Sequence, residues 1–386
     1  MLITNKKRKI CCITGSRGDY GYLRPIMQKI NKDLDLELIS VAIGMHSLKK
    51  FGKSIEEVKK DFPEVIEVPL KLQEDTGYGT TKYLSEAIMK ISKILKQTNP
   101  DLVLLLGDRT EIFAATQAAA FQNIPIAHLH GGDKSSGLDE PIRHSITKFA
   151  QIHFPATKKS AQRIKNMGEE PHRIFLVGSS TLDEILNFKP IERKELFHKY
   201  DLNSEKPFLL IIYHPITAQK NQIQEKIKIL LNAVLKTKIQ TLILYPNNDE
   251  GGQLIIDNIK QFEEKNLIYK QNLPRKDFLS LLKQAEILIG NSSSGIIEAP
   301  SFKLPVINLG IRQKNREKAE NVIDIENFNE ENILHVINYA LKNKKFRKKL
   351  KNCKNPYGDG HASERICNIL KKIKLDQDLL QKKIIY

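Results

Sequence analysis

The chain has 386 residues, a formal net charge of +17 at pH 7 and a sequence pI near 9.4. This length suits two α/β domains of similar size better than one. The lysines and arginines are spread over nearly every expected helix, without interleaved stacking aromatics or any tryptophan, so we expect solvated helix faces and no nucleic-acid partner.

Membrane insertion, secretion and metal-binding cysteines are also not expected. No apolar run approaches the roughly 20 residues that a membrane span needs, and the start lacks the apolar core of a signal peptide. We therefore expect a cytoplasmic protein without membrane contact. The four cysteines follow neither disulfide nor zinc-site spacing, and we interpret all of them as packing residues or free thiols.

Strand-like apolar runs alternate with amphipathic helical windows along the chain, which is typical of parallel sheets covered by helices on both faces. In the first half we expect strands at 9–15, 36–44, 65–70, 101–108, 124–132, 152–157 and 173–178. A charged stretch at 189–207 interrupts this rhythm and marks a domain boundary at or just before it. A second series predicts strands at 208–215, 241–249, 267–273, 285–295 and 305–310.

This α/β pattern predicts two Rossmann-like domains. We expect the N-terminal domain to span residues 1–180 and the C-terminal domain to span residues 181–365. The amphipathic segment at 361–375 is expected to return to the first domain, so that residues 366–386 form a helix and tail packed on it.

Ligands of open α/β sheets lie beyond the carboxyl ends of the strands, so polar residues that directly follow a strand are the first candidates for a site. Arg17 and Asp19 follow the first strand in a glycine turn, which fits a phosphate-binding loop or a solvent-facing ion pair. Asp108 and Arg109 follow a buried strand. The Asp108 carboxylate is either an acid-base group with a tuned pKa or a cap of the next helix.

A histidine pair and an acidic pair follow next in the chain. His128 and His130 are two residues apart in an expected strand, so their side chains point to the same side, as metal ligands can. No third and fourth ligands accompany them, so we expect no metal site. Asp139 and Glu140 precede Arg143 by about one helical turn. They are either proton-relaying or sugar-binding carboxylates, or helix N-terminal charges that the dipole favours.

The second domain offers an imidazole and a serine-rich loop. His214 follows a strand and is either an acid or phosphate ligand, or a satisfied core histidine. Residues 290–295, with the sequence GNSSSG, lead from a strand into a helix, with Glu298 about one turn in. Serine hydroxyls and helix N–H groups bind diphosphates, and a carboxylate suits ribose hydroxyls; the alternative is a polar loop that caps a helix. Arg312 adds a cation after the next strand, and the absence of GxxxxGK[ST] argues against a P-loop NTPase.

Seven segments in this order resemble the hydrolysing UDP-N-acetylglucosamine 2-epimerases over almost the whole chain: SRGDYG, LGDR, HLHGGD, DEPIRHSITK, YHP, IGNSSSG with Glu298, and INLGIRQ. The likeness is to the bacterial sialic- and legionaminic-acid branch and to the epimerase half of the bifunctional animal enzyme, to which Tyr357–Gly360 is also similar. It implies a GT-B-like arrangement with the ligand cleft between the two domains, UDP against the C-terminal one, and homodimers or homotetramers. It implies neither an organic cofactor nor a metal.

The resemblance also implies a reaction, in which anti elimination of UDP gives a glycal and hydration then gives the C2-inverted free sugar. The implied catalytic residues are Asp108, Asp139, Glu140, His130 and His214, of which His214 assists departure of the diphosphate. The implied substrate-binding residues are Arg17, Asp19, Arg109, Arg143, Asn247, Ser292, Ser293, Ser294, Gly295, Glu298 and Arg312.

Non-hydrolysing relatives have a Val-Glu-Ala-Gly-like segment where this chain has Leu129–Gly132, and the animal enzyme also keeps a glutamate at the position of His130. The histidine resembles the bacterial hydrolysing branch, so we expect hydrolysis. It leaves open which group handles the proton that this glutamate would carry. The substrate is either UDP-N-acetylglucosamine, giving N-acetylmannosamine, or UDP-2,4-diacetamido-2,4,6-trideoxyglucose. A non-hydrolysing epimerase, a GT-B glycosyltransferase and a catalytically inactive binding protein are the other readings.

Overall fold

The protein forms two compact units. The structure is a computed structural model that describes residues 7–47, 54–71, 76–134, 138–186, 188–216, 221–246, 251–262, 264–271 and 273–385. Unit 1 comprises Met1–Leu186 together with Tyr357–Tyr386, and unit 2 comprises Asn187–Pro356. Unit 1 is therefore built from two separate stretches of chain, with unit 2 inserted between them.

Unit 1 contains a six-stranded parallel sheet in the order β3-β2-β1-β4-β5-β6. Its strands are β1 (Arg8–Thr14), β2 (Leu36–Ile43), β3 (Ile66–Val68), β4 (Leu102–Leu106), β5 (Ile126–Leu129) and β6 (Ile152–Phe154). Its helices are α1 (Arg17–Lys32), α2 (Ile55–Asp61), α3 (Gly77–Thr98), α4 (Thr110–Ala120), α5 (Asp139–Phe149), α6 (Lys158–Asn166), α7 (Asp183–Leu186), α15 (Ala362–Lys372) and α16 (Gln377–Leu380). This is the strand order of dinucleotide-binding folds, and it reverses between β1 and β4.

Unit 2 repeats this topology with the order β12-β11-β10-β7-β8-β9. Its strands are β7 (Phe208–Ile212), β8 (Gln240–Leu244), β9 (Leu267–Lys270), β10 (Ile287–Gly290), β11 (Val306–Leu309) and β12 (Val322–Ile325). Its helices are α8 (Arg193–Lys199), α9 (Ile223–Leu235), α10 (Gly252–Lys260), α11 (Arg275–Gln284), α12 (Ser293–Ile297), α13 (Glu330–Lys342) and α14 (Lys344–Lys351). Its strand order reverses between β7 and β10, so the expected α/β class with two Rossmann-like sheets is confirmed.

One strand prediction was wrong, and one strand was missed. Residues 173–178 do not form a strand, because only Ile174 makes a single parallel bridge, to His153. Leu176 in this segment is 47% exposed, so the run lies along the sheet edge without extending the ladder. The sequence analysis also missed β12, a four-residue strand in which the exposed Asp324 interrupts the apolar run.

The buried cysteines show how the sheet of unit 1 is covered on both faces. Cys11 and Cys12 are adjacent in β1, where side chains alternate between faces. Each belongs to a different hydrophobic cluster, and both are fully buried. All four cysteines are free and buried, which confirms their interpretation as packing residues or free thiols.

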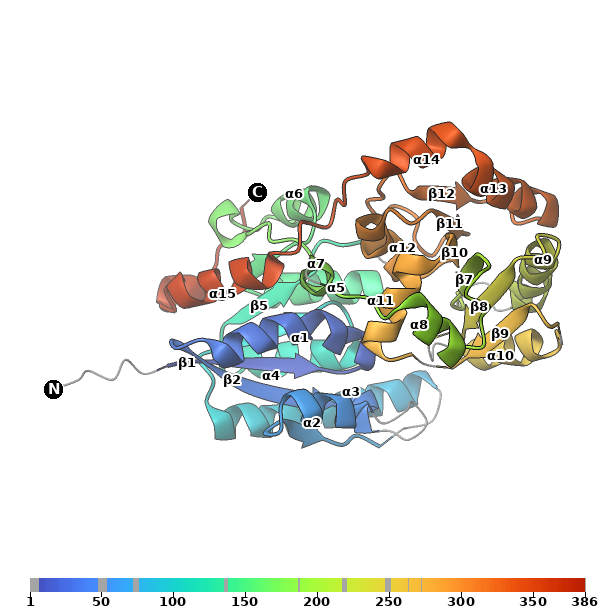
Figure 1. Cartoon of the computed structure of the whole chain (residues 1–386). Helices are drawn as coiled ribbons and strands as arrows, with labels where there is room; N and C mark the ends of the chain where they lie inside the picture. Colours follow the sequence, from blue (N-terminus) through green and yellow to red (C-terminus); the bar gives the residue numbers. More distant parts are fainter. Residues whose placement is uncertain are drawn as a thin grey trace. The chain divides into compact units, whose positions relative to one another are not determined.

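The C-terminal helix α15 completes the core of unit 1. Ala362, Ile366 and Leu370 recur every fourth residue and are buried, so they form one apolar face of the helix. They belong to the same cluster as Leu23 and Ile26 of α1, and Figure 1 shows α15, in red, beside α1. Residues far apart in the sequence thus share one core.

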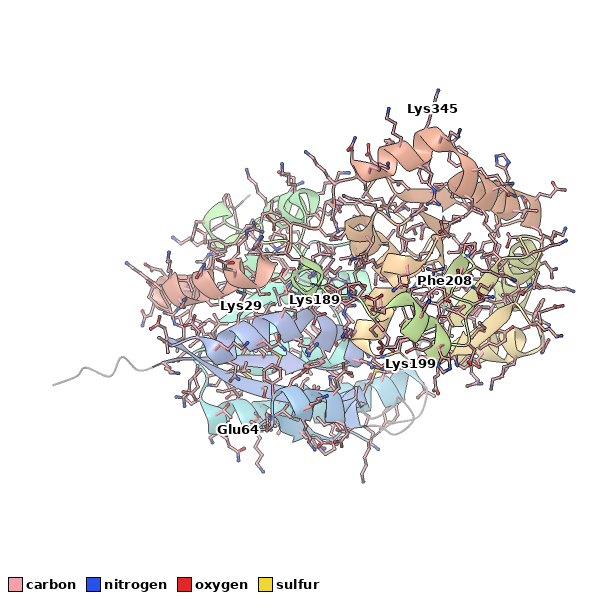
Figure 2. The ribbon with its side chains drawn as sticks, viewed as in Figure 1. Lys29, Glu64, Lys189, Lys199, Phe208 and Lys345 are labelled. Carbon is pink, nitrogen blue, oxygen red and sulfur yellow. The ribbon has the colours of Figure 1, made fainter. Side chains whose placement is uncertain are left out.

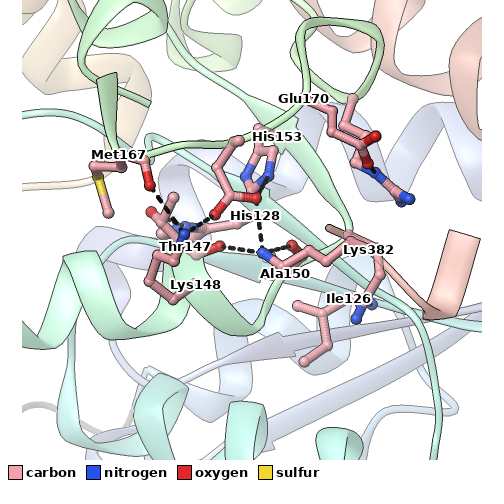
Figure 3. Close-up of polar contacts among 12 residues, drawn as sticks. Ile126, His128, Thr147, Lys148, Ala150, His153, Met167, Glu170 and Lys382 are labelled. Atoms are coloured by element: carbon pink, nitrogen blue, oxygen red, sulfur yellow. Dashed lines mark hydrogen bonds and ion pairs between the residues drawn. The ribbon is translucent and has the colours of Figure 1, made fainter. Parts of the chain in front are cut away.

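A buried ion cluster ties the following tail to the same unit (Figure 3). Lys382 Nζ lies 2.7 Å from Glu169 Oε2 and donates to the Ala150 carbonyl at 2.8 Å. Lys148 Nζ lies 2.7 Å from Glu169 Oε1, and His153 Nε2 lies 3.1 Å from Oε2. Burial raises the pKa of Glu169, but hydrogen bonds from His153, Lys148 and Lys382 lower it to about 2. The cluster is therefore charged at neutral pH.

Three of the lysines that Figure 2 labels lie on the outside of helices. Lys29 of α1, Lys199 of α8 and Lys345 of α14 are all exposed, whereas Phe208 is fully buried with its ring centroid 5.2 Å from that of Phe197. The three lysines agree with the interpretation of the charge as solvated helix faces. In the part of the chain that the structure describes, no helix is long and apolar enough to cross a membrane.

Candidate functional site

In unit 1, the first candidate residues lie beyond β1 and β4, where the strand order reverses. Ser16 caps α1, with its hydroxyl accepting from the Asp19 N–H at 3.3 Å. Asp19 is therefore held in the first helical turn. Arg17, one residue after the cap, is exposed and lies 3.1 Å from Glu57, so the solvent-facing ion pair weighed from the sequence is present for Arg17.

Asp19 belongs to a cluster around the Arg109 guanidinium. Arg109 Nε lies 3.6 Å from Asp19 Oδ2 and 3.4 Å from Glu111 Oε2. Glu111 is 2% exposed, and its other oxygen accepts a hydrogen bond from Tyr83 at 2.7 Å. Burial raises the pKa of Asp19 to about 6; Arg109 opposes this change, and the Glu111 and Asp108 carboxylates add to it. The pKa of Asp19 is thus raised above the ordinary value of a carboxyl group, as is common for groups that exchange protons.

Asp108 is the partner of a buried arginine. Arg143 of α5 is 5% exposed and donates through Nη2 to Asp108 Oδ2 and through Nη1 to the His130 carbonyl, the latter at 2.9 Å. The residue at the N-cap of α4 is Arg109, whose side chain makes no capping hydrogen bond. Asp108 thus lies one residue before the N-cap position of that helix. Arg143 joins the ends of β4 and β5 through one side chain.

The two histidines of the HLHGGD segment have separate surroundings. His128 is fully buried, and burial lowers its pKa to about 3, so the ring is neutral at pH 7. Its Nε2 lies 2.8 Å from the Gly107 carbonyl and must carry the proton, while Nδ1 accepts from Thr147 at 3.1 Å. In the described ranges, no group of three or more His, Cys, Asp or Glu side chains is placed to hold a metal ion.

His130 lies just beyond β5 in a left-handed conformation, with φ of 58°. It is 6% exposed, its Nδ1 lies 2.8 Å from Asp133 Oδ2, and its Nε2 lies 3.2 Å from Ser179 Oγ. Asp133 in turn accepts from Ser160 at 2.7 Å. Both ring nitrogens are therefore engaged inside the protein. This arrangement fixes the orientation of the ring and argues against direct proton abstraction by His130.

The YGDG segment is where the chain re-enters unit 1. The Ser179 N–H donates to the Tyr357 carbonyl at 2.7 Å. Gly178 and Gly358 both have positive φ, and a Cβ on Gly178 would come within 3.0 Å of the Tyr357 carbonyl. The two backbones approach each other so closely that a glycine is required at position 178. This contact lies directly beside Ser179, the hydrogen-bond partner of His130.

Asp139 and Glu140 occupy the first turn of α5, four and three residues before Arg143. Asp139 is exposed, and Glu140 Oε1 lies 3.3 Å from Lys134 Nζ and 3.4 Å from His144 Nε2. This position is also the one that a helix dipole favours for carboxylates. The structure is therefore compatible with both interpretations given from the sequence.

In unit 2, the backbone crosses closely where the strand order reverses. Gly290 ends β10 with φ of 140°, and a Cβ there would lie 2.0 Å from the Ile212 carbonyl of β7. The Asn291 side chain then accepts from the His214 N–H at 2.7 Å and donates to the His214 carbonyl at 2.8 Å. His214 is partly exposed, so it is not the buried core histidine of the alternative interpretation.

The serine loop forms the start of α12. Ser292 is the N-cap, with its hydroxyl 3.4 Å from the Ser294 N–H and 2.9 Å from the Ser294 hydroxyl. Ser293 is partly exposed and Ser294 is buried. A Cβ on Gly295 would come within 2.9 Å of Val306 Cγ1, so a glycine at this position suits the close packing against β11.

The remaining candidates of unit 2 include one residue that the sequence analysis missed. Glu298 is 5% exposed, and its Oε1 lies 2.5 Å from Arg275 Nη2 at the start of α11. Arg275 follows β9, so the rule that polar residues after a strand are candidates for a site could have identified it. Arg312 Nη1 donates to the Asn291 carbonyl at 3.2 Å. Asn247 lies outside the described residues.

Glu111, Asp133 and Ser179 were also missed in unit 1. Glu111 and Asp133 each offered a local signal, since Glu111 lies three residues after Asp108 and Asp133 three residues after His130, whereas Ser179 contacts His130 from 49 residues away. The two units thus each present charged and hydroxyl side chains at the end of the sheet where Rossmann folds bind nucleotides.

Comparison with known proteins identifies the family. A family model described as UDP-N-acetylglucosamine 2-epimerase matches residues 28–371. A Legionella pneumophila protein named UDP-N,N'-diacetylbacillosamine 2-epimerase (hydrolyzing) is 38% identical over 377 residues, covering 97% of this chain and 98% of its own. A Campylobacter jejuni protein named GDP/UDP-N,N'-diacetylbacillosamine 2-epimerase (hydrolyzing) is 36% identical over 325 residues, covering 83% and 85%.

The fold agrees with solved structures of the same group. The crystal structure of UDP-GlcNAc 2-epimerase from Neisseria meningitidis bound to UDP-GlcNAc aligns with a TM-score of 0.80 at 21% identity, covering 95% of this chain and all of that one. The family model and the two relatives each span most of the sequence. The chain therefore belongs to the UDP-N-acetylglucosamine 2-epimerase family.

Proposed function

We propose that the protein hydrolyses a UDP-linked 2-acetamido sugar, inverting C2 and releasing UDP and the free sugar. The observation that carries this proposal is the 38% identity, over 97% of the chain, to a relative named as hydrolyzing. The segment Leu129–Gly132 supports it, because His130 occupies the position at which non-hydrolysing relatives usually have a glutamate. The buried contacts of His130 suit a residue that shapes the site.

In the first step, a carboxylate takes the proton from C2 while the bond between C1 and the diphosphate oxygen breaks, leaving a glycal. In the second step, water supplies a hydroxyl group to C1, and a proton returns to C2 on the opposite face. We assign the proton transfers to Asp108 and Asp139, with Glu140 beside them. Asp19 supports this assignment of acid-base chemistry to unit 1, because its pKa lies near 6.

We assign stabilisation of the departing diphosphate to unit 2. Negative charge that develops on a leaving group is stabilised by preoriented donors and cations. His214, Arg312 and the Ser292–Ser294 hydroxyls supply such groups, with Gly295 shaping the loop. Glu298 is assigned to the ribose hydroxyls. Asn247 completes the UDP-binding set that the resemblance implies, and in unit 1 Arg17, Arg109 and Arg143 are assigned to orienting the sugar and diphosphate.

For the sugar, we propose UDP-N,N'-diacetylbacillosamine as the first candidate, because both hydrolyzing relatives carry this substrate in their names. This sugar differs from UDP-N-acetylglucosamine at C4, which bears a second acetamido group, and at C6, which is a methyl group. UDP-N-acetylglucosamine is the second candidate, since the family description names it.

The test is incubation of the purified protein with each nucleotide sugar in D₂O. We expect UDP and a C2-inverted free sugar that carries one deuterium at C2, since elimination and hydration replace that hydrogen with one from solvent. Comparing kcat/KM for the two sugars identifies the substrate. A stable UDP-linked epimer without free UDP would contradict hydrolysis, and UDP release only when an acceptor sugar is added would indicate a glycosyltransferase.

A further inference from the structure

Asn291 lies at the point of unit 2 where ligands of Rossmann-like sheets bind. It directly follows β10, and β7 is the neighbouring strand across which the strand order reverses. The residue is fully buried, and its main-chain N–H donates to the Ile212 carbonyl at 3.1 Å. Asn291 thus extends the contact between the two strands by one residue beyond the ladder.

The side chain of Asn291 then holds the chain that leaves β7. Its Oδ1 accepts from the His214 N–H at 2.7 Å, and its Nδ2 donates to the His214 carbonyl at 2.8 Å. A side-chain amide therefore takes the place of a neighbouring backbone peptide. Only an amide of this length offers both the acceptor and the donor, because aspartate lacks the donor and leucine lacks both.

The carbonyl of Asn291 holds the segment after β11. It accepts from Arg312 Nη1 at 3.2 Å and from Gln313 Nε2 at 3.0 Å, and Gln313 is 2% exposed. All four polar groups of Asn291 are thus engaged with two segments, residues 212–214 and residues 312–313. These two segments carry the imidazole and the guanidinium that the proposed function assigns to the departing diphosphate.

We propose that Asn291 is a positioning residue for departure of the diphosphate, holding His214 and Arg312 in fixed register with the serine loop. The proposal rests on the proposed function for the roles of those two residues. Asn291 itself is fully buried, so it acts through them rather than by contact with the substrate. Misplacing a catalytic group by about 1 Å reduces rates by on the order of 10²-fold.

The test compares Asn291→Asp with Asn321→Asp. Asn321 is also fully buried in unit 2, and its Nδ2 donates to the Leu304 carbonyl at 2.8 Å. Both substitutions remove a buried donor, so we expect both to lower the thermal midpoint. Only Asn291→Asp should lower kcat and weaken UDP binding in calorimetry, each by about tenfold or more. Should Asn291→Asp not fold, the smaller, uncharged Asn291→Ser is measured in the same way.

A double-mutant cycle with His214→Ala tests whether Asn291 acts through His214. We expect Asn291→Asp to reduce kcat far less in the His214→Ala background than in the wild type. Additive losses, or equal kcat and UDP affinity in Asn291→Asp and Asn321→Asp, would overturn the proposal. A wild-type protein that binds UDP but releases none from either sugar would refute the proposed function, while the UDP affinities would still decide the role of Asn291.

Discussion

Replacing Asp108 with asparagine separates acid-base chemistry from the stabilisation of Arg143. The substitution keeps an oxygen for the Arg143 guanidinium but removes the negative charge of the pair. A hydrogen bond that involves a charged group contributes about 1.5–3 kcal/mol and a neutral one about 0.5–1.5 kcal/mol. We therefore expect a loss of about 1–1.5 kcal/mol, which lowers the melting temperature by about 2–6 °C for a unit of this size.

The effect of Asp108→Asn on turnover should be larger than its effect on stability. A positioned acid or base contributes about 10²-fold or more to kcat, which corresponds to about 2.7 kcal/mol in the activation barrier. UDP affinity should change little, because we assign UDP mainly to unit 2 and because Arg143 keeps an oxygen partner at residue 108. The assay is release of UDP under saturating substrate, alongside calorimetric titration with UDP.

Asp61→Asn is the matched control. The Asp61 side chain is 17% exposed, as is that of Asp108, and it pairs with Arg24 at 2.7 Å in the same unit. We expect a similar loss of thermal stability and nearly normal kcat. If Asp108→Asn retains as much activity as Asp61→Asn, Asp108 serves only to hold Arg143, and the acid-base role passes to Asp139 or Glu140.

Three further predictions concern the ion cluster and the glycine of β10. Lys382→Met should destabilise the protein by about 2 kcal/mol in urea titrations, because it removes one of the cations around a buried carboxylate; an unchanged midpoint would contradict this. The pKa of Glu169 is held at about 2, below its ordinary value, so its contribution to stability is present above about pH 4.5 and is lost as pH falls toward 2. Glu169→Gln should flatten the wild-type stability profile in that range, and parallel profiles would refute the assignment. Gly290→Ala should abolish UDP binding because its Cβ would meet the Ile212 carbonyl at 2.0 Å, whereas Gly77→Ala, with open space around the new Cβ, should bind UDP normally.

The sequence was sufficient for features that depend on local patterns. Alternating apolar runs located both sheets, and polar residues after strands located Asp108 and His214. Pairings between distant segments were not accessible in this way. Arg143 reaches Asp108 from a helix 35 residues later, and Arg275 reaches Glu298 from another strand's end. Such pairs depend on how helices pack on the sheet, which the pattern of a single segment does not contain.

The backbone of His130 was likewise unpredictable from periodicity. The alternation that placed His128 and His130 on one face applies only within a strand, and β5 ends at Leu129. The positive φ of His130 turns its ring toward Asp133 and Ser179 instead. Local strain of this kind is maintained by the surrounding hydrogen bonds and leaves no signature in the residue pattern.

Because α15 and the tail complete the core of unit 1, this unit cannot finish folding until the C-terminal residues have been synthesised. At about 5–20 residues per second, the ribosome needs on the order of 10–40 s to add the roughly 200 residues between Leu186 and the tail. During that interval α1 lacks its apolar cover from Ile366 and Leu370, while unit 2 is already complete before α15 emerges. The nascent chain therefore exposes an apolar surface that a ribosome-associated chaperone would be expected to bind.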